Sequence, residues 1–264
     1  MIVKPDTQPV ANPVSLAEAK LHLRVDHSDE DVLIASLVNA ATEWCEQFEG
    51  QAYMVRSYKA HLDTFSWEVR LPSPPLIAVD SIQYYDANGD IQTLSTDIYT
   101  VDNDSVPGRV YLAFRESWPT TYNVPKSVVI SYTAGYATTL TAADTDICTV
   151  GNAVFADTDR VRVGSGGGLP SGLSSDTDYY VRDVSGSTLK LAATEGGDAV
   201  DITTTGTGTH YIGFANRGLI PARVLAAIKL LVGHWYEHRE QVSDVRFMTV
   251  PHAAQTLLTE RVWQ

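Results

Sequence analysis

The sequence predicts an α+β protein whose helical domain is built from both chain ends. Apolar residues recur every three or four positions in residues 15–50 and 221–241, the pattern of helices with one buried face. Residues 53–136 instead alternate apolar and polar side chains, which predicts strands. Residues 138–215 hold 12 of the 18 glycines and many threonines. We therefore expect a β region between the helical ends and an inserted, Gly/Thr-rich all-β module.

Composition limits the class of protein. The 264 residues are 44% hydrophobic and 19% charged, enough for a buried core. The net charge of -13 argues against wrapping nucleic acid by neutralising its phosphates. The sequence contains no run of 18 apolar residues, so we expect no membrane span. The first residues also lack the apolar segment of a signal peptide. Cys45 and Cys148 form no disulfide framework, so we expect free thiols and folding in a reducing cytoplasm.

Two helices are predicted near the start of the chain. Ser15 followed by Glu18 forms a capping box at the start of a short helix. A second helix of about 20 residues follows, which Ser28 can cap and Gly50 can end. Its apolar positions are Ile34, Leu37, Val38, Ala41, Trp44, Cys45 and Phe48.

The β region is expected to contain two hairpins. Asn88 and Gly89 suit the turn of the first, and the second turns near Pro107 and Gly108. The alternating Asp86, Asn88 and Asp90 could suggest a calcium loop, but the other ligands of such a loop are missing. The hairpin turn is the preferred interpretation.

The Gly/Thr-rich module reads as five or six short strands joined by glycine turns. Its stretch "GSGGGLPSG" lacks the lysine of a phosphate-binding loop. Tyrosines 179, 180 and 211 could bind sugar, or could form the core of a small β domain, which is the preferred interpretation. After the module, Pro221 begins a helix with the apolar stripe of Val224, Leu225, Ile228, Leu231, Val232 and Trp235, and Pro251 begins another.

Several pieces, in order, resemble the head–tail connector (adaptor, or head-completion) proteins of long-tailed bacteriophages. They are "VSLAEAKLHLRVDHSDEDVLIASLVNAATEWCEQFEGQ", "LPSPPLIAVDSIQYYDANGD", "YTVDNDSVPGRVYL", "SWP", "VVISYTAGY", "IPARVLAAIKLLVGHWYEHRE" and "LLTERVW", covering most of residues 14–136 and 219–264. The departure lies at about residues 138–215, where the family has a short link. We accordingly expect four segments: 1–52 (helical, first part), 53–137 (β region), 138–215 (inserted β module) and 216–264 (helical, second part, with a C-terminal arm).

The resemblance implies a virion structural protein and no enzyme, cofactor or metal. It implies a ring, usually of twelve subunits, under the portal at the head–tail interface, made in the bacterial host cytoplasm. The ring extends the DNA channel, lets genomic DNA pass without specific binding, and offers a platform for the next neck or tail protein. Candidate contacts to a neighbouring subunit or the portal are Trp235, Tyr236, His238, Arg239, Arg246, Arg261 and Trp263. Another neck or tail protein, or a carbohydrate-binding decoration protein, is the alternative.

A zinc hydrolase is a second alternative. His234, Glu237 and His238 match the H-x-x-E-H pattern, in which two imidazoles share a helix face and the glutamate is the general base. A third ligand would have to be Glu240, on the wrong helix face, or Glu260. The preferred interpretation is the end of a packed helix, where Trp235 continues the apolar stripe and His238 and Arg239 complement the helix dipole.

Overall fold

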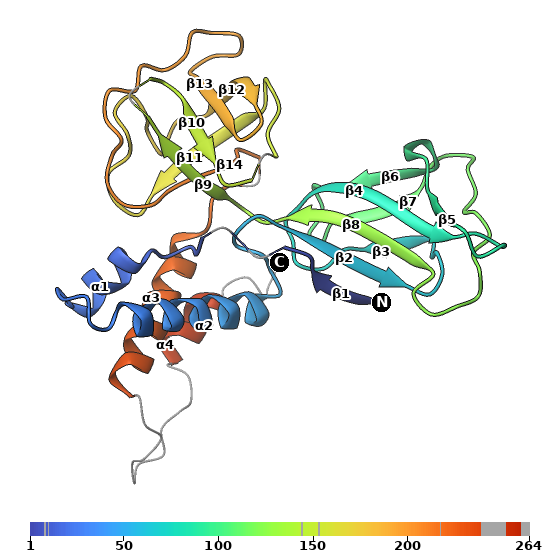
Figure 1. The fold of residues 1–264 in the computed structure, drawn as a ribbon, viewed down its shortest axis with the longest axis horizontal. Coiled ribbons are helices and arrows are strands. Elements are labelled where there is room, and N and C mark those ends of the chain that lie inside the picture. Colours follow the sequence, from blue (N-terminus) through green and yellow to red (C-terminus); the bar gives the residue numbers. More distant parts are fainter. Residues whose placement is uncertain are drawn as a thin grey trace. The chain divides into compact units, whose positions relative to one another are not determined.

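The computed structural model describes residues 1–264 except 8, 10, 144, 153, 217, 239–251 and 260–264 (Figure 1). These residues form a mixed α and β fold with four α-helices and fourteen strands. The chain divides into two compact units: unit 1 is Met1–Pro9 with Gly50–Gly135, and unit 2 is Val10–Glu49 with Tyr136–Gln264. In the part of the chain so described, no helix is long and apolar enough to cross a membrane.

Unit 1 consists of two antiparallel sheets. Five strands form one sheet in the order β1-β2-β8-β4-β5, and three form the other in the order β3-β7-β6. The strands are β1 (Ile2–Pro5), β2 (Arg56–Leu62), β3 (Glu68–Arg70), β4 (Leu76–Tyr85), β5 (Ile91–Thr93), β6 (Tyr99–Asp102), β7 (Arg109–Leu112) and β8 (Val128–Ala134), with the short 3-10 helix η1 (Thr96–Ile98) before β6.

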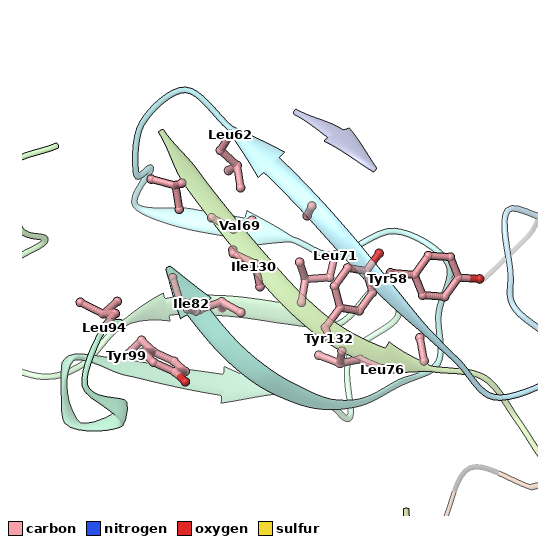
Figure 2. Packing of buried hydrophobic residues seen from close by; sticks show 14 of the residues in the cluster. Tyr58, Leu62, Val69, Leu71, Leu76, Ile82, Leu94, Tyr99, Ile130 and Tyr132 are labelled. Atoms are coloured by element: carbon pink, nitrogen blue, oxygen red, sulfur yellow. The ribbon is translucent and has the colours of Figure 1, made fainter. Parts of the chain in front are cut away.

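Alternation along the strands produces the core of unit 1. Every second residue of β2 is buried, and β2 pairs with β8 over its whole length. Figure 2 shows these inward side chains together with those of the three-stranded sheet. The rings of Tyr58 and Tyr132 stack with their centroids 5.3 Å apart. The cluster labelled there is Tyr58, Leu62, Val69, Leu71, Leu76, Ile82, Leu94, Tyr99, Ile130 and Tyr132.

Both predicted hairpins are confirmed. β4 and β5 pair around a turn in which Gly89 has φ +89°, and β6 pairs with β7. The Asp86 carboxylate accepts backbone N–H groups of Asn88 and Asp90 at 2.8 and 3.1 Å. These hydrogen bonds lower the pKa of Asp86. One Asp86 oxygen thus stabilises the turn by accepting these two N–H groups, which agrees with a hairpin turn at this position.

Strand β1 was not predicted. Val3 is half-buried against the core and the other three residues are exposed, a segment too short for alternation to be visible in the sequence. It is held by pairing with the distant strand β2 and by the 2.9 Å ion pair between Asp6 and Lys59. The first residues therefore belong to unit 1, whereas the sequence placed residues 1–52 with the helices.

The helices of unit 2 are α1 (Leu16–Leu23), α2 (Asp31–Glu49), α3 (Ala222–Glu237) and α4 (His252–Thr259). The capping box of α1 is confirmed: the Glu18 backbone N–H donates to Ser15 Oγ at 3.2 Å, and the Glu18 carboxylate accepts the Ser15 N–H at 3.0 Å. α2 begins at Asp31, three residues after the expected cap Ser28, whose carbonyl accepts the Asp31 N–H. α2 packs against α3, and both contact α4.

One ion pair ties three of these helices together. Arg223 of α3 lies 2.5 Å (Nη1 to Oε1) from Glu49 of α2, with side chains 16% and 4% exposed. The same Nη1 donates to the carbonyl of Leu257 in α4 at 3.4 Å. A pair this well shielded from water makes the helix arrangement sensitive to either partner.

The Gly/Thr-rich residues form a closed six-stranded barrel in the order β10-β13-β12-β11-β14-β9 (Figure 1). Its strands are β9 (Thr138–Ala142), β10 (Cys148–Val150), β11 (Arg160–Ser165), β12 (Tyr179–Ser185), β13 (Thr188–Ala192) and β14 (His210–Phe214). The first and last strands pair with each other, so the chain enters and leaves the barrel at neighbouring places. The glycine-rich loop packs on Thr207: a Cβ on Gly167 would lie 2.3 Å from the Thr207 carbonyl oxygen.

The barrel contacts the start of α1 within unit 2. The Tyr211 hydroxyl donates to the Pro13 carbonyl at 2.6 Å, and burial raises the pKa of Tyr211. A Cβ on Gly166 would lie 2.2 Å from the Glu18 carboxyl carbon, and Lys229 of α3 approaches Glu18 at 3.5 Å. Glu18 therefore caps α1, pairs with α3 and borders the barrel.

We predict that Gly135→Ala destabilises unit 1. Gly135 has φ +137°, and a Cβ there would lie 2.7 Å from backbone atoms of Met54 and Val55. Strain and overlap together should lower the free energy of unfolding by roughly 2–4 kcal/mol. Urea titration followed by tryptophan fluorescence measures the change. Gly89→Ala is the matched control, because φ is +89° but no atom lies within 4 Å; about 1 kcal/mol is expected. Equal losses would contradict the steric argument.

We also predict that Arg223→Met weakens the helical part of unit 2. The substitution removes a cation from a carboxylate that is 4% exposed, so roughly 3–5 kcal/mol should be lost. The double variant with Glu49→Met should recover most of it. Circular dichroism of the helical signal during urea unfolding measures both. Arg70→Met, which breaks the exposed pair with Glu68, should cost about 0–1 kcal/mol. A double variant no more stable than the single would refute the buried-pair interpretation.

Candidate functional site

The candidate site lies at the end of α3, where the sequence placed both the zinc alternative and part of the contact surface. One face of α3 is buried, through Val224, Ala227, Ile228, Leu231 and Val232. Beyond it, Gly233 lies against α1: a Cβ there would be 3.4 Å from His22 Nε2. A Cβ at that distance would be in ordinary van der Waals contact, so α3 packs against α1 at this point and the helix end is positioned by its own chain.

Three of the seven predicted contact residues fall in the described part of this helix end. Trp235 and Tyr236 are half-buried and His238 is exposed. The Tyr236 hydroxyl donates to the Glu30 carboxylate, directly before α2. Arg239, Arg246, Arg261 and Trp263 lie outside the described residues. Tyr236 therefore has an intrachain role. The pairing of Tyr236 with Glu30 joins positions far apart in the sequence, so spacing did not predict it.

The histidines of the H-x-x-E-H pattern do lie on one helix face. The rings of His234 and His238 are 4.7 Å apart between centroids and tilted by 32°. His238 Nδ1 lies 2.9 Å from the His234 carbonyl oxygen. A carbonyl only accepts, so Nδ1 carries the proton, and Nε2 is the nitrogen of His238 that could bind a metal. Among the described residues no group of three or more His, Cys, Asp or Glu could hold a metal ion. Glu240 and Glu260, the third ligands considered, lie outside that part of the chain.

Both cysteines are buried, as expected for Cys45. Each is 0% exposed, and burial raises the pKa of Cys45 to about 12 and that of Cys148 to about 11. The thiolate is the reactive form, so neither residue has the low pKa of a catalytic nucleophile.

The barrel tyrosines are mostly committed to the fold. Tyr179 is 3% exposed and Tyr211 is 5% exposed. The Tyr179 hydroxyl accepts the Ser174 N–H at 2.8 Å, and Tyr211 holds the Pro13 carbonyl. Only Tyr180 of the three is half-buried rather than buried. Stacking on a sugar needs exposed rings, so the core interpretation of these tyrosines is favoured.

Residues 13–103 match the family described as phage gp6-like head-tail connector protein. No curated protein matches the chain. Three solved structures have a similar fold. The chain is 17% identical to one in the neck of an empty gene transfer agent (GTA) particle computed with C6 symmetry, at a TM-score of 0.56. It is 16% identical to one in the virion of the native GTA particle, and to one in the native neck computed with C12 symmetry, with TM-scores of 0.55 and 0.54.

Each of these similarities covers 98% of this chain and 93% of the other, so it extends over the barrel as well as the helices. The matched family is one of connector proteins, in agreement with the expectation of a structural protein without catalysis. The resemblance read from the sequence is confirmed over residues 13–103, which match the phage gp6-like head-tail connector family.

Proposed function

We propose that this protein is a ring-forming head–tail connector of a phage or phage-like particle. It docks under the portal, extends the DNA channel and presents a platform for the next neck or tail protein. The observation that carries the proposal is the family match over residues 13–103, which includes α1, α2 and the first strands of unit 1 after β1. Its place is the virion neck, after synthesis in the bacterial host cytoplasm.

The structural similarities support the proposed ring. Two of the similar chains come from necks computed with C6 and C12 symmetry. A rotational assembly places each copy in head-to-tail contact with two neighbours. We propose twelve copies of this chain per ring.

The charge of the chain supports passage of DNA without specific binding. The net charge is -13. Binding to the DNA backbone depends on cations that displace counterions, and an acidic protein has few to spare. A conduit that repels phosphate lets the genome move through it.

We propose that the barrel is a module inserted into a smaller connector and that it faces away from the channel. Its first and last strands are hydrogen-bonded neighbours, which supports insertion at a single point of a host fold. A module of this size on the channel wall would obstruct DNA.

We propose that the C-terminal arm, residues 242–264, contacts the portal together with Trp235, His238, Arg239, Arg246, Arg261 and Trp263. Within the arm, α4 is already packed in unit 2, with Ala254 0% and Leu258 1% exposed. The docking function then falls to residues on either side of α4. Tyr236, which bonds Glu30 in its own chain, is better suited to holding the end of α3 in place.

Mass measurement of the purified protein, alone and mixed with the portal of its particle, tests the ring. Twelve chains of 28.8 kDa give a mass of about 350 kDa, and six give about 170 kDa. We expect the twelve-copy mass. In the same preparation, duplex DNA should not co-migrate with the ring at physiological salt. A monomer under both conditions would contradict the proposed function.

A further inference from the structure

Four large hydrophobic side chains stand out on the surface. Among the described residues, only Leu21, Val32, Trp67 and Phe114 are large hydrophobics more than three-quarters exposed, at 81%, 86%, 77% and 86%. They fall into two pairs, Leu21 and Val32 in unit 2 and Trp67 and Phe114 in unit 1. Apolar residues scattered singly over a surface are ordinary, whereas apolar residues gathered at one place can mark a contact surface.

The first pair lies where α1 meets α2. The Lys20–Asp31 ion pair, 2.6 Å long, joins the two helices at the residues next to Leu21 and Val32. From Leu21 to Val32 the chain carries the acids Asp26, Asp29, Glu30 and Asp31 against the single arginine Arg24. Asp26 is exposed, and the side chain of Asp29 is 89% exposed. We call Leu21, Val32, Asp26 and Asp29 the acidic corner.

The second pair lies on two loops at one end of unit 1. Trp67 ends the β2–β3 loop, and Phe114 follows β7, the strand whose Tyr111 pairs with Glu68. Phe65 of one loop stacks on Trp118 of the other, with ring centroids 4.7 Å apart and planes 1° apart. The Lys126 N–H donates to Asp63 Oδ1 at 2.8 Å, which joins the same two loops again. These contacts order the loops beneath the exposed rings.

A cation lies beside the exposed rings. The Arg115 guanidinium lies 5.1 Å from the centre of the Phe114 ring. Arg115 is exposed. Its own segment, residues 113–127, carries Arg115 and Lys126 against Glu116, and the other loop adds Asp63 and the neighbouring Glu68. Arg115 is therefore the cation next to the exposed rings, on a loop pair that is not basic as a whole. Tryptophan, phenylalanine and arginine on preordered loops are the composition of an interface anchor. We call Trp67, Phe114 and Arg115 the aromatic tip.

We propose that the aromatic tip of one copy packs on the acidic corner of a second copy. The inference rests on the proposed ring and names its subunit contact. Each surface is apolar at its centre, and the cation of Arg115 on one meets the carboxylates of Asp26 and Asp29 on the other. The two surfaces differ, so each copy uses one toward each neighbour. Such a head-to-tail contact closes into a ring or continues as a filament.

Engineered cysteines test the contact in the full chain. Trp67→Cys combined with Val32→Cys, and Phe114→Cys combined with Leu21→Cys, should each give a ladder of disulfide-linked multimers under mild oxidation. Each single-cysteine variant should give no disulfide-linked species larger than a dimer. The native Cys45 and Cys148 are 0% exposed and should form no disulfide under mild oxidation. The control pairs Val32→Cys with Ile91→Cys, a position that is 62% exposed but belongs to neither surface.

A charge exchange tests the pairing independently. Arg115→Glu and the pair Asp26→Arg with Asp29→Arg should each weaken assembly about tenfold, the scale of one lost interface anchor. Combining all three should restore the ring mass. Trp67→Ser with Phe114→Ser should also weaken assembly, whereas Ile91→Ser should not. Unchanged melting temperatures would show that all variants fold.

The outcomes separate this inference from the proposed function. Ladders in the tip–corner pairs and rescue by charge exchange support the contact. A wild-type ring that survives every tip and corner variant, without a ladder, overturns the contact and leaves the ring intact. Tip variants that form normal rings but fail to join portal or tail assign the tip to another protein and overturn the inference. A wild-type chain that stays monomeric, alone and with portal, overturns both.

Discussion

The packing of α2 against α3 is the constraint on which the rest of unit 2 depends. Each helix has an apolar face that water would otherwise meet, and the two faces come from opposite ends of the sequence. The shielded Arg223–Glu49 pair fixes their relation and reaches α4 through the Leu257 carbonyl. Because the helices that pack together come from the two ends of the chain, each β part between them must begin and end at neighbouring positions in space.

Both β parts of the chain meet that requirement in the same way. Unit 1 ends at Gly135, whose missing side chain lets the strand leave directly beside Met54 and Val55, where the chain entered. The barrel begins and ends on paired strands, β9 and β14. Close entry and exit let each β part fold around its own core without pulling the helices apart. The conformational freedom of one glycine and the closure of one barrel are therefore architectural requirements.

Local chemistry made the helices and hairpins predictable, whereas long-range contacts were not. The Ser15–Glu18 cap and the Gly89 turn act over a few residues and appear where they were expected. In α2, Ile34, Val38, Ala41 and Cys45 of the predicted stripe are buried, whereas Phe48 at the helix end is 43% exposed. Strand β1 depends on pairing with β2, a partner far along the chain, and leaves no local pattern. The candidate site could be predicted only in part. The i, i+4 histidines were correctly placed on one helix face, but spacing gave no sign of the hydrogen bond from Tyr236 to Glu30. Trp67 and Phe114 resemble core residues by type, and only the fold shows them exposed.

The closure of the barrel affects how many copies of it can lie close together without exchanging strands. The two sheets of unit 1 end in strands such as β5 and β6, which have a hydrogen-bonded neighbour on one side only, whereas each barrel strand has a neighbour on both sides. In a ring, identical modules are held at a local concentration far above that in solution, a condition that promotes strand exchange between copies. A barrel without edges offers no row of unpaired backbone groups for such exchange. Closure makes this the kind of domain that a symmetric particle can carry in many copies without joining them.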